Sequence, residues 1–514
     1  MSNREHLFNL IQSMSRTEKG YFKKMYADKG LARPNKYVEL FDLIDNQKIY
    51  NEPAIVANFQ NKGIFKQLSV AKNYLNTMIL KSLRAYNSKG SVNVELNERM
   101  MNIEILFNKG LNAMVEKEIR KVEQMIDEHE AFHRFPELAR WKKNLLDKTA
   151  DQRLIGKLRQ DLHEKEMKMI DKARVFAEIS NLTFQLLSVY LKIGTVRNRS
   201  QFKEYQTVMR NPILRDESKL NSFSSWYYFH NIHSMYFDAI KDYNNFHYHT
   251  DCFVKLIEEN PKHIERNPAV YVSSCFNRVL SLVKLQDTLG FEKALEHFKD
   301  ISKKWGHFLT SDLERDMWIY ESNTRMWQFR LHGEYAKMRD LGESVQNRSE
   351  EQIFIYPFSV LYSEVVYLST YASFAIGEYK YAIKKLNLII NNSLREQRED
   401  IACYAMILNL MCHYELGNFD YVESSVRSTY RFLVKLEKIY AFEKALISFF
   451  RKLLKQNNLA DLSGFMIDFR TKLEELEKDL YEKSAFEYVD LISWLSAHIE
   501  NRPFTEVALE RAKK

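Results

Sequence analysis

The chain has 514 residues, of which 45% are hydrophobic and 28% are charged, and its formal net charge is +8. This balance is typical of a folded protein with a well-solvated surface and excludes an intrinsically disordered chain. Gly and Pro are scarce, at 14 and 8 residues, and no sustained alternation of apolar and polar residues indicates strands, so we expect an all-α protein with short loops.

The amino-terminal sequence MSNREHLFNL has neither the apolar core nor the cleavage site of a signal peptide. No run approaches the roughly 18 apolar residues of a membrane span, so we expect a cytoplasmic protein without a transmembrane segment. The four cysteines are dispersed and form no C-x-x-C pair, which predicts reduced and mostly buried thiols. They are Cys252, Cys275, Cys403 and Cys412.

Residues 1–90 carry the whole formal surplus of positive charge. They contain 15 Lys and Arg against 7 Asp and Glu, which leaves 61 basic and 61 acidic residues in the rest of the chain. Ser15 and Glu18 fit a capping box for a helix over residues 16–27. Further helices are expected over residues 36–46, 53–59 and 64–86. We therefore predict a small basic helical module over residues 1–90, ahead of a second domain over residues 91–514.

The helix expected over residues 64–86 is amphipathic, with a basic solvent face. Its apolar stripe consists of Phe65, Leu68, Leu75, Ile79, Leu83 and Tyr86. The candidate partner-binding residues of the module are Lys62, Lys66 and Arg84, on the opposite face, and Lys81 at its margin. The three helices resemble a helix-turn-helix arrangement, with Lys66, Gln67, Ser69, Lys72 and Asn73 on the recognition helix. Three roles stay open: an end cap, a docking face for an acidic protein or membrane surface, and nucleic-acid binding.

Residues 129–133 match the zinc-protease motif H-E-x-x-H. The segment follows a helical apolar stripe through Val115, Ile119, Val122 and Ile126. We expect His129 and His133 to continue that stripe on the same helix and to close a packed face, and we expect no zinc.

A second group of histidines surrounds an expected helical hairpin. It comprises His230, His233, His247 and His249, with Cys252 nearby. A metal site and an aromatic packing segment with His at its polar edge both fit this group, and packing is favoured. The sequence has no phosphate-binding loop, dinucleotide-binding fingerprint or nucleophile elbow. We therefore expect no enzyme, no catalytic residue and no cofactor.

One turn recurs in the second half of the chain: Gly, a polar residue, an aromatic residue and, three positions further on, a small or apolar residue. It occurs at Gly333-Glu334-Tyr335 with Met338, at Gly377-Glu378-Tyr379 with Ala382, at Gly417-Asn418-Phe419 with Val422 and, one residue shorter, at Gly290-Phe291 with Ala294. Gly can take the left-handed conformation that ends a helix, and the small residue lets two helices approach closely. The turn therefore predicts helical hairpins.

The aromatic positions of this turn recur at a period of forty-odd residues. From Phe291 through Tyr335, Tyr379, Phe419 and Leu459 to Phe504 the spacings are 44, 44, 40, 40 and 45 residues, and a weaker series runs back through Tyr243, Phe202, Leu158 and Leu111. Such a period corresponds to one helix pair per repeat, and the pairs must stack to bury their apolar faces.

Residues 375–390 (AIGEYKYAIKKLNLII) and 415–426 (ELGNFDYVESSV) resemble the junction between the two helices of a tetratricopeptide repeat. The period here is longer than the family's, which is about 34 residues. The resemblance implies a divergent right-handed α-α superhelix of about ten antiparallel pairs, with a period of 40–48 residues. The opening residues 7–26 also resemble the start of bacterial proteins of this build, which implies no function.

The resemblance implies a binding groove on the concave side of the repeats. Its candidate residues are Tyr320, Asn323, Trp327, Arg330, Tyr367, Tyr371, Tyr404 and Tyr414. Tyr, Trp and Arg are the residues that most often anchor interfaces. We therefore expect a non-catalytic scaffold that binds a protein or peptide. The alternative is a nucleic-acid-binding regulator that uses residues 1–90, with the repeats as a sensor or dimerisation domain. The oligomeric state is not predicted.

Overall fold

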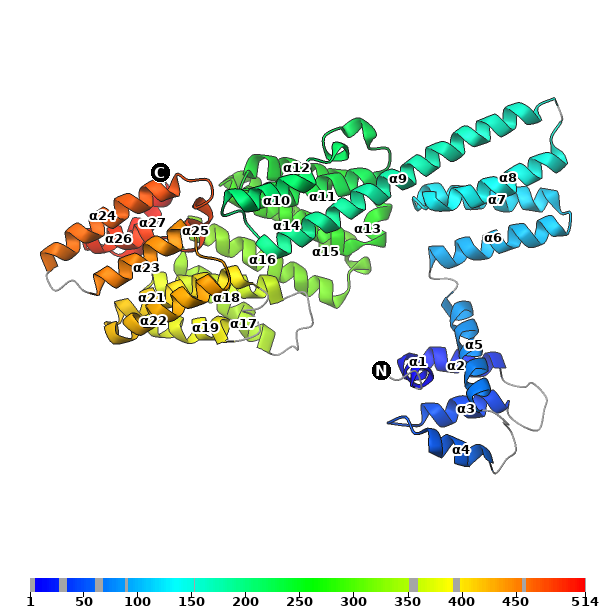
Figure 1. Cartoon of the computed structure of the whole chain (residues 1–514), viewed down its shortest axis with the longest axis horizontal. Helices are drawn as coiled ribbons and strands as arrows, with labels where there is room; N and C mark the ends of the chain where they lie inside the picture. The colour runs from blue at the N-terminus through cyan, green and yellow to red at the C-terminus, as the bar shows by residue number, and fades with distance from the viewer. Residues whose placement is uncertain are drawn as a thin grey trace. The chain divides into compact units, whose positions relative to one another are not determined.

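All regular structure in the computed structural model of the chain is helical where residues are described (Figure 1). The described residues are 5–26, 35–60, 68–87, 91–151, 153–350, 359–391, 398–454 and 459–513. The predicted all-α class is confirmed. Within these ranges, no helix combines the length and the apolar character that spanning a bilayer requires.

The chain forms two compact units, an amino-terminal unit (Met1–Ala173) and a carboxy-terminal unit (Arg174–Lys514). The boundary between them lies inside the long helix α9 (Ile155–Ile193). The predicted boundary at residue 90 falls among residues 88–90, outside the described part of the chain, and stays a prediction.

The amino-terminal unit begins with five helices around one core. They are α1 (His6–Ser13), α2 (Arg16–Tyr26), α3 (Lys36–Asp45), α4 (Glu52–Gln60) and α5 (Leu68–Asn87). The predicted capping box is present, because the Ser15 amide donates to Glu18 at 2.8 Å and the Glu18 amide donates to Ser15 Oγ at 3.2 Å. Leu75 and Ile79 of α5 are fully buried. Tyr86 was expected on the same stripe but is 39% exposed. It lies in the last turn of α5, where its ring and that of Tyr21 meet edge to face.

The rest of this unit is a second helical layer with its own core. It contains α6 (Val92–Asn108), α7 (Asn112–Glu128), the 3-10 turn η1 (Phe132–Arg134), α8 (Phe135–Thr149) and the first part of α9. Gly110, just before Leu111 of the weaker series, joins α6 to α7 in the left-handed conformation, with φ +74°. The apolar stripe of α7 is fully or almost fully buried, as its period predicts.

The carboxy-terminal unit is a stack of helical hairpins. Its helices are α10 (Arg199–Met209), α11 (Phe223–Ala239), α12 (Tyr243–Glu258), α13 (Lys262–Arg266), α14 (Pro268–Lys284), α15 (Thr288–Trp305), α16 (Ser311–Leu331), α17 (Tyr335–Glu350), α18 (Ser359–Ala375), α19 (Tyr379–Asn391), α21 (Glu399–Glu415), α22 (Phe419–Lys435), α23 (Ala441–Leu453), α24 (Leu459–Glu477), α25 (Lys483–Tyr488), α26 (Leu491–Glu500) and α27 (Phe504–Ala512). Each of α14, α16, α18 and α21 pairs with the helix that follows it, and α14 contacts α16, α16 contacts α18 and α18 contacts α21. These first helices therefore form one continuous layer.

The predicted hairpin turns are confirmed at three of four places. Gly333, Gly377 and Gly417 have φ of +69°, +84° and +73°, and the amide of the residue after each glycine donates to the carbonyl five positions earlier. This hydrogen bond satisfies a carbonyl that the helix end leaves free. The fourth turn was wrongly placed at Gly290. There the left-handed residue is Gln286, with φ +58°, and Gly290 lies inside α15.

The last helices fold back onto the layer of first helices. In Figure 1, α24, α26 and α27 lie together in orange and red, and α26 contacts both of the others. Phe504, at the start of α27, packs against Tyr335, Tyr371 and Phe374, with ring centroids 5.7–6.4 Å apart. The carboxy-terminal helices therefore cover part of α18 and the start of α17.

Substituting Ala382 tests the repeat register. Ala382 is fully buried beneath the turn at Gly377, and Lys380, two residues earlier, is exposed. Ala382→Trp overpacks this contact and is expected to lower the free energy of unfolding by about 1 to 3 kcal/mol. Urea unfolding of Ala382→Trp and of the control Lys380→Trp measures the difference. Equal losses in the two variants would contradict the register.

Candidate functional site

The inner wall of the carboxy-terminal unit is defined here by Trp327 and Arg330 of α16, Tyr367 and Tyr371 of α18, and Tyr404 of α21. Except for Arg330, which is half-buried, their side chains are buried. They come from successive first helices, so the contacts between these helices bring them together. The wall combines aromatic surface with a guanidinium group, the side-chain types that most often anchor a bound protein segment.

Residues 479–490, which include α25, lie against this wall; we call them the seated segment. Tyr488 stacks flat on Tyr404, with ring centroids 4.8 Å apart and planes 8° apart. Its ring also meets the edge of Trp327 at 5.7 Å, and Tyr367 donates a hydrogen bond from its hydroxyl to the Tyr488 carbonyl at 3.0 Å. The wall thus holds one tyrosine of the chain's own carboxy-terminal region by its ring and its backbone.

Glu487, next to Tyr488, forms the first ionic anchor of the seated segment. Its carboxylate lies 2.9 Å from Lys284 Nζ and 3.5 Å from Lys241 Nζ, and it accepts a hydrogen bond from the Tyr243 hydroxyl. Burial alone raises the pKa of a carboxyl group, but the two ammonium groups hold the pKa of Glu487 well below its usual value. Glu487 is therefore ionised, and replacing it with a neutral residue leaves Lys241 and Lys284 without their shared counterion.

Arg197, in the loop before α10, forms the second ionic anchor. It binds both carboxylate oxygens of Glu443 at 3.1 and 3.2 Å and one oxygen of Glu482 at 2.9 Å. All three side chains are at most 8% exposed. Glu482 also accepts hydrogen bonds from the backbone amides of Ala441 and Phe442 at the start of α23. Burial raises the pKa of Glu443, although the positive charge of Arg197 acts to lower it. Such a network gives little net stability but fixes the position of its members.

The structure brings together five of the eight predicted groove residues, namely those of the inner wall. Tyr320 stacks on Phe276 at 4.3 Å instead, and Asn323 is buried at 1% exposure. Tyr414 packs on Trp494 at 5.5 Å. The anchors Arg197, Lys241, Lys284 and Glu487 were missed, because each lies 203 to 285 residues from its partners in sequence and no local pattern marks such pairs.

Of the predicted basic residues of the amino-terminal module, Lys62 and Lys66 lie outside the described residues. Lys81 and Arg84 are exposed on α5. Lys72, expected on the recognition helix, instead binds Glu52 at 3.2 Å and the Tyr50 hydroxyl at 2.7 Å. The exposed basic surface of α5 is thus smaller than its sequence predicts.

The predicted continuation of α7 through His129 and His133 is wrong. The helix ends at Glu128, Glu130 takes the left-handed conformation with φ +51°, and the Ala131 amide donates to the Ile126 carbonyl at 3.0 Å. The chain turns between the two histidines, and His133 is exposed. A zinc protease needs both histidines on one helical face, so this arrangement does not fit that chemistry.

The histidines of α11 and α12 form a packed cluster. His230 Nδ1 and His249 Nδ1 lie 3.1 Å apart, His233 Nδ1 lies 2.8 Å from the Phe229 carbonyl, and the rings of His233 and His249 stack at 4.6 Å. Burial lowers the pKa of His230 to about 4 and that of His249 to about 3, and it also lowers the pKa of His233. The geometry supports the packing interpretation, with neutral rings at neutral pH.

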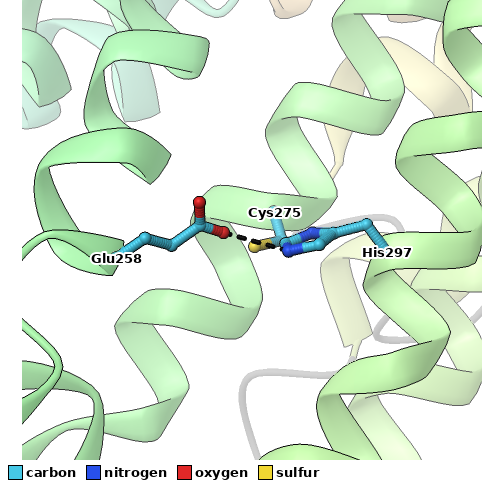
Figure 2. Close-up of side chains that lie close together, drawn as sticks. All are labelled: Glu258, Cys275 and His297. Carbon is cyan, nitrogen blue, oxygen red and sulfur yellow. Dashed lines mark ion pairs between the residues drawn. The ribbon is translucent and has the colours of Figure 1, made fainter.

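Figure 2 shows Glu258, Cys275 and His297, whose ligand atoms lie within 4.8 Å of one another. The Arg278 guanidinium approaches His297 Nδ1 at 2.8 Å and can only donate, so Nε2 carries the ring proton and donates to Glu258 at 3.0 Å. A metal-binding His uses one nitrogen for the metal and donates from the other. Burial also raises the pKa of the Cys275 thiol to about 12. The three residues fit a hydrogen-bonded contact between α12, α14 and α15 rather than a metal site.

No protein-family model matches this sequence, and no curated protein is significantly similar to it. The resemblance to tetratricopeptide repeats therefore depends on the junction motifs and on the turns that the structure places there.

The histidine cluster predicts a loss of stability in acid. An unfolded His has a pKa near 6.5, so between about pH 6.5 and the lowered folded values the unfolded chain binds more protons. The stabilising contribution is complete above pH 6.5 and is lost as the pH falls toward 4. From pH 7 to 5, urea unfolding of the wild type is expected to lose about 1 to 2 kcal/mol more than His249→Phe. The exposed control His307→Phe should follow the wild type, and identical pH dependence in all three proteins would contradict the prediction.

Proposed function

We propose that this protein is a non-catalytic scaffold that binds a protein partner beside the seated segment, on the part of the inner wall of its carboxy-terminal unit that this segment leaves open. One observation carries the proposal: the wall already holds a segment of the chain itself, through an aromatic stack and two ionic anchors. Aromatic and guanidinium groups that are preorganised on packed helices lose little conformational entropy when a segment binds. The wall is therefore chemically suited to segments that combine carboxylates with aromatic rings.

The finer features of the fold belong to the same proposal. The left-handed glycine turns and the contacts between successive first helices support a divergent tetratricopeptide-like, right-handed superhelix. All four cysteines are free, which agrees with a cytoplasmic location.

Nucleic-acid binding by the amino-terminal module is the second candidate. It is favoured by the exposure of Lys81 and Arg84 on α5. Against it, three other basic residues of the module form ion pairs: Lys19 with Asp45, Lys23 with Asp42, and Lys72 with Glu52. Ion-paired lysines contribute less to the positive field that attracts a phosphate backbone.

An affinity capture from the native cell tests the scaffold proposal. The full chain is compared with Lys483→Glu, an exposed position of the seated segment beside the wall, and with the double variant Lys81→Glu, Arg84→Glu as the matched control on the other unit. We expect a protein retained in stoichiometric amount by the wild type and the double variant, and retained at least about tenfold less by Lys483→Glu, because the reversed charge repels an acidic segment.

Two results would contradict the proposal. The first is that no protein is retained in stoichiometric amount by the wild type. The second is that only the double variant loses its partner, so that the amino-terminal module and not the wall binds it. Salt-dependent retention of nucleic acid by the wild type would in addition favour the second candidate.

A further inference from the structure

A cavity of about 680 Å³ lies between the inner wall and the carboxy-terminal helices. Its aromatic and aliphatic lining comes from α14, α16, α17, α18, α25 and α27. The apolar lining residues are Val283, Trp327, Leu331, Tyr335, Tyr371 and Phe486, with Ala508 and Ala512 of α27. Cavities of this size with mostly apolar walls are typical of small-molecule and side-chain binding sites.

Three carboxylates line the cavity, and each has a cationic partner. Glu487 is paired with Lys284, and Asp490 is paired with Arg511 at 2.6 Å. Glu477 also pairs with Arg511. Arg511 is thus shared by Glu477 and Asp490, and each of the three carboxylates has a cation beside it.

Arg330 is different, because no described residue forms an ion pair or a hydrogen bond with its guanidinium, although the charge of Asp490 acts on it without such a pair. Its guanidinium lies 4.1 Å from the Tyr371 ring centroid and 5.4 Å from that of Trp327. Its Nη1 atom is buried without a hydrogen-bond partner, and the same is true of the Tyr371 hydroxyl, on a side chain only 1% exposed. A buried donor without a partner costs about 1 to 3 kcal/mol, so both side chains have a hydrogen-bonding group that the described residues leave unsatisfied.

The charge of the lining limits what can bind there. The lining cations are Lys284, Arg330, Lys483 and Arg511, and the lining anions are Glu477, Glu487 and Asp490. The lining therefore has a net positive charge, which attracts an anion. A carboxylate also matches the planar donor fork of Arg330, and the aromatic walls suit an apolar body.

We propose that this cavity binds a carboxylate carried on an apolar body, with Arg330 as its ion-pair partner. Lys483, exposed at the edge of the cavity, adds attraction for the incoming charge. The carboxylate can belong to a free organic acid or to an acidic residue of a bound protein segment. The site does not require the scaffold function, because a free acid fills it equally well.

Calorimetric titration of the full chain at low salt tests the site. The probes are phenylacetate with its neutral control phenylacetamide, and the blocked peptide acetyl-Phe-Glu-Tyr-amide with its Gln counterpart. We expect at least one acid to bind and its neutral control to bind at least about tenfold more weakly, since a charge-assisted bidentate pair is lost. Binding of phenylacetate identifies a free acid as sufficient; binding of the peptide alone identifies a protein carboxylate.

Variants assign the binding to Arg330. Arg330→Gln is expected to weaken the acid at least about tenfold. Arg325→Gln is the matched control, because Arg325 lies on the same helix and pairs with Glu292 instead; it should bind as the wild type does. Lys483→Gln changes an exposed side chain and should weaken binding of the acid by about two- to fivefold. This variant replaces Arg330→Gln as the test of the site if Arg330→Gln does not fold. The proposal is overturned if neither acid binds the wild type, if the neutral probes bind equally well, or if a folded Arg330→Gln binds the acid like the wild type. If Arg330→Gln does not fold, wild-type binding by Lys483→Gln overturns it.

Discussion

The arrangement of the carboxy-terminal unit depends on one constraint: charges removed from water must find partners of opposite sign. Glu487 and Glu482 leave the solvent when residues 479–490 lie against the inner wall, and they are matched by Lys284 and Lys241 and by Arg197. A slide of the segment by one residue separates every one of these pairs. The ion pairs therefore fix the register of the seated segment, while the stack of Tyr488 on Tyr404 and the burial of Phe486 supply the apolar gain.

This constraint also explains why the carboxy-terminal helices do not simply extend the stack of hairpins. In a helical-repeat array each hairpin contacts its neighbours, and most contacts are local in sequence. Here the contact between Arg197 and Glu482 joins residues 285 positions apart, and Phe504 packs on Tyr371. The inner wall is thus largely covered by its own chain. The place left open is the cavity beside Arg330, whose guanidinium forms no ion pair with any described residue.

Features that depend on neighbouring residues could be predicted from the sequence. The turns at Gly333, Gly377 and Gly417 need only one left-handed residue and the hydrogen bond across it, and both follow from the local motif. The same reasoning failed at Glu130 and Gln286, where residues other than glycine take the left-handed conformation and no composition signal marks it. The aromatic residues of the inner wall could be predicted from the repeat. The ionic anchors of the seated segment could not be predicted, because Lys284 and Glu487 meet only after the whole unit has folded.

Amide hydrogen exchange across residues 479–490 measures most directly whether the segment is held by its ionic anchors. Exchange there reports the free energy of opening the segment alone. In the wild type, these amides should exchange as slowly as those of α16 and α18. In Glu487→Gln they should exchange at least about tenfold faster, because Lys241 and Lys284 lose their counterion. The exchange rates of α6 and α7 in the other unit should stay unchanged. Fast exchange of residues 479–490 in the wild type, or the same slow exchange in both proteins, would contradict this view of the inner wall.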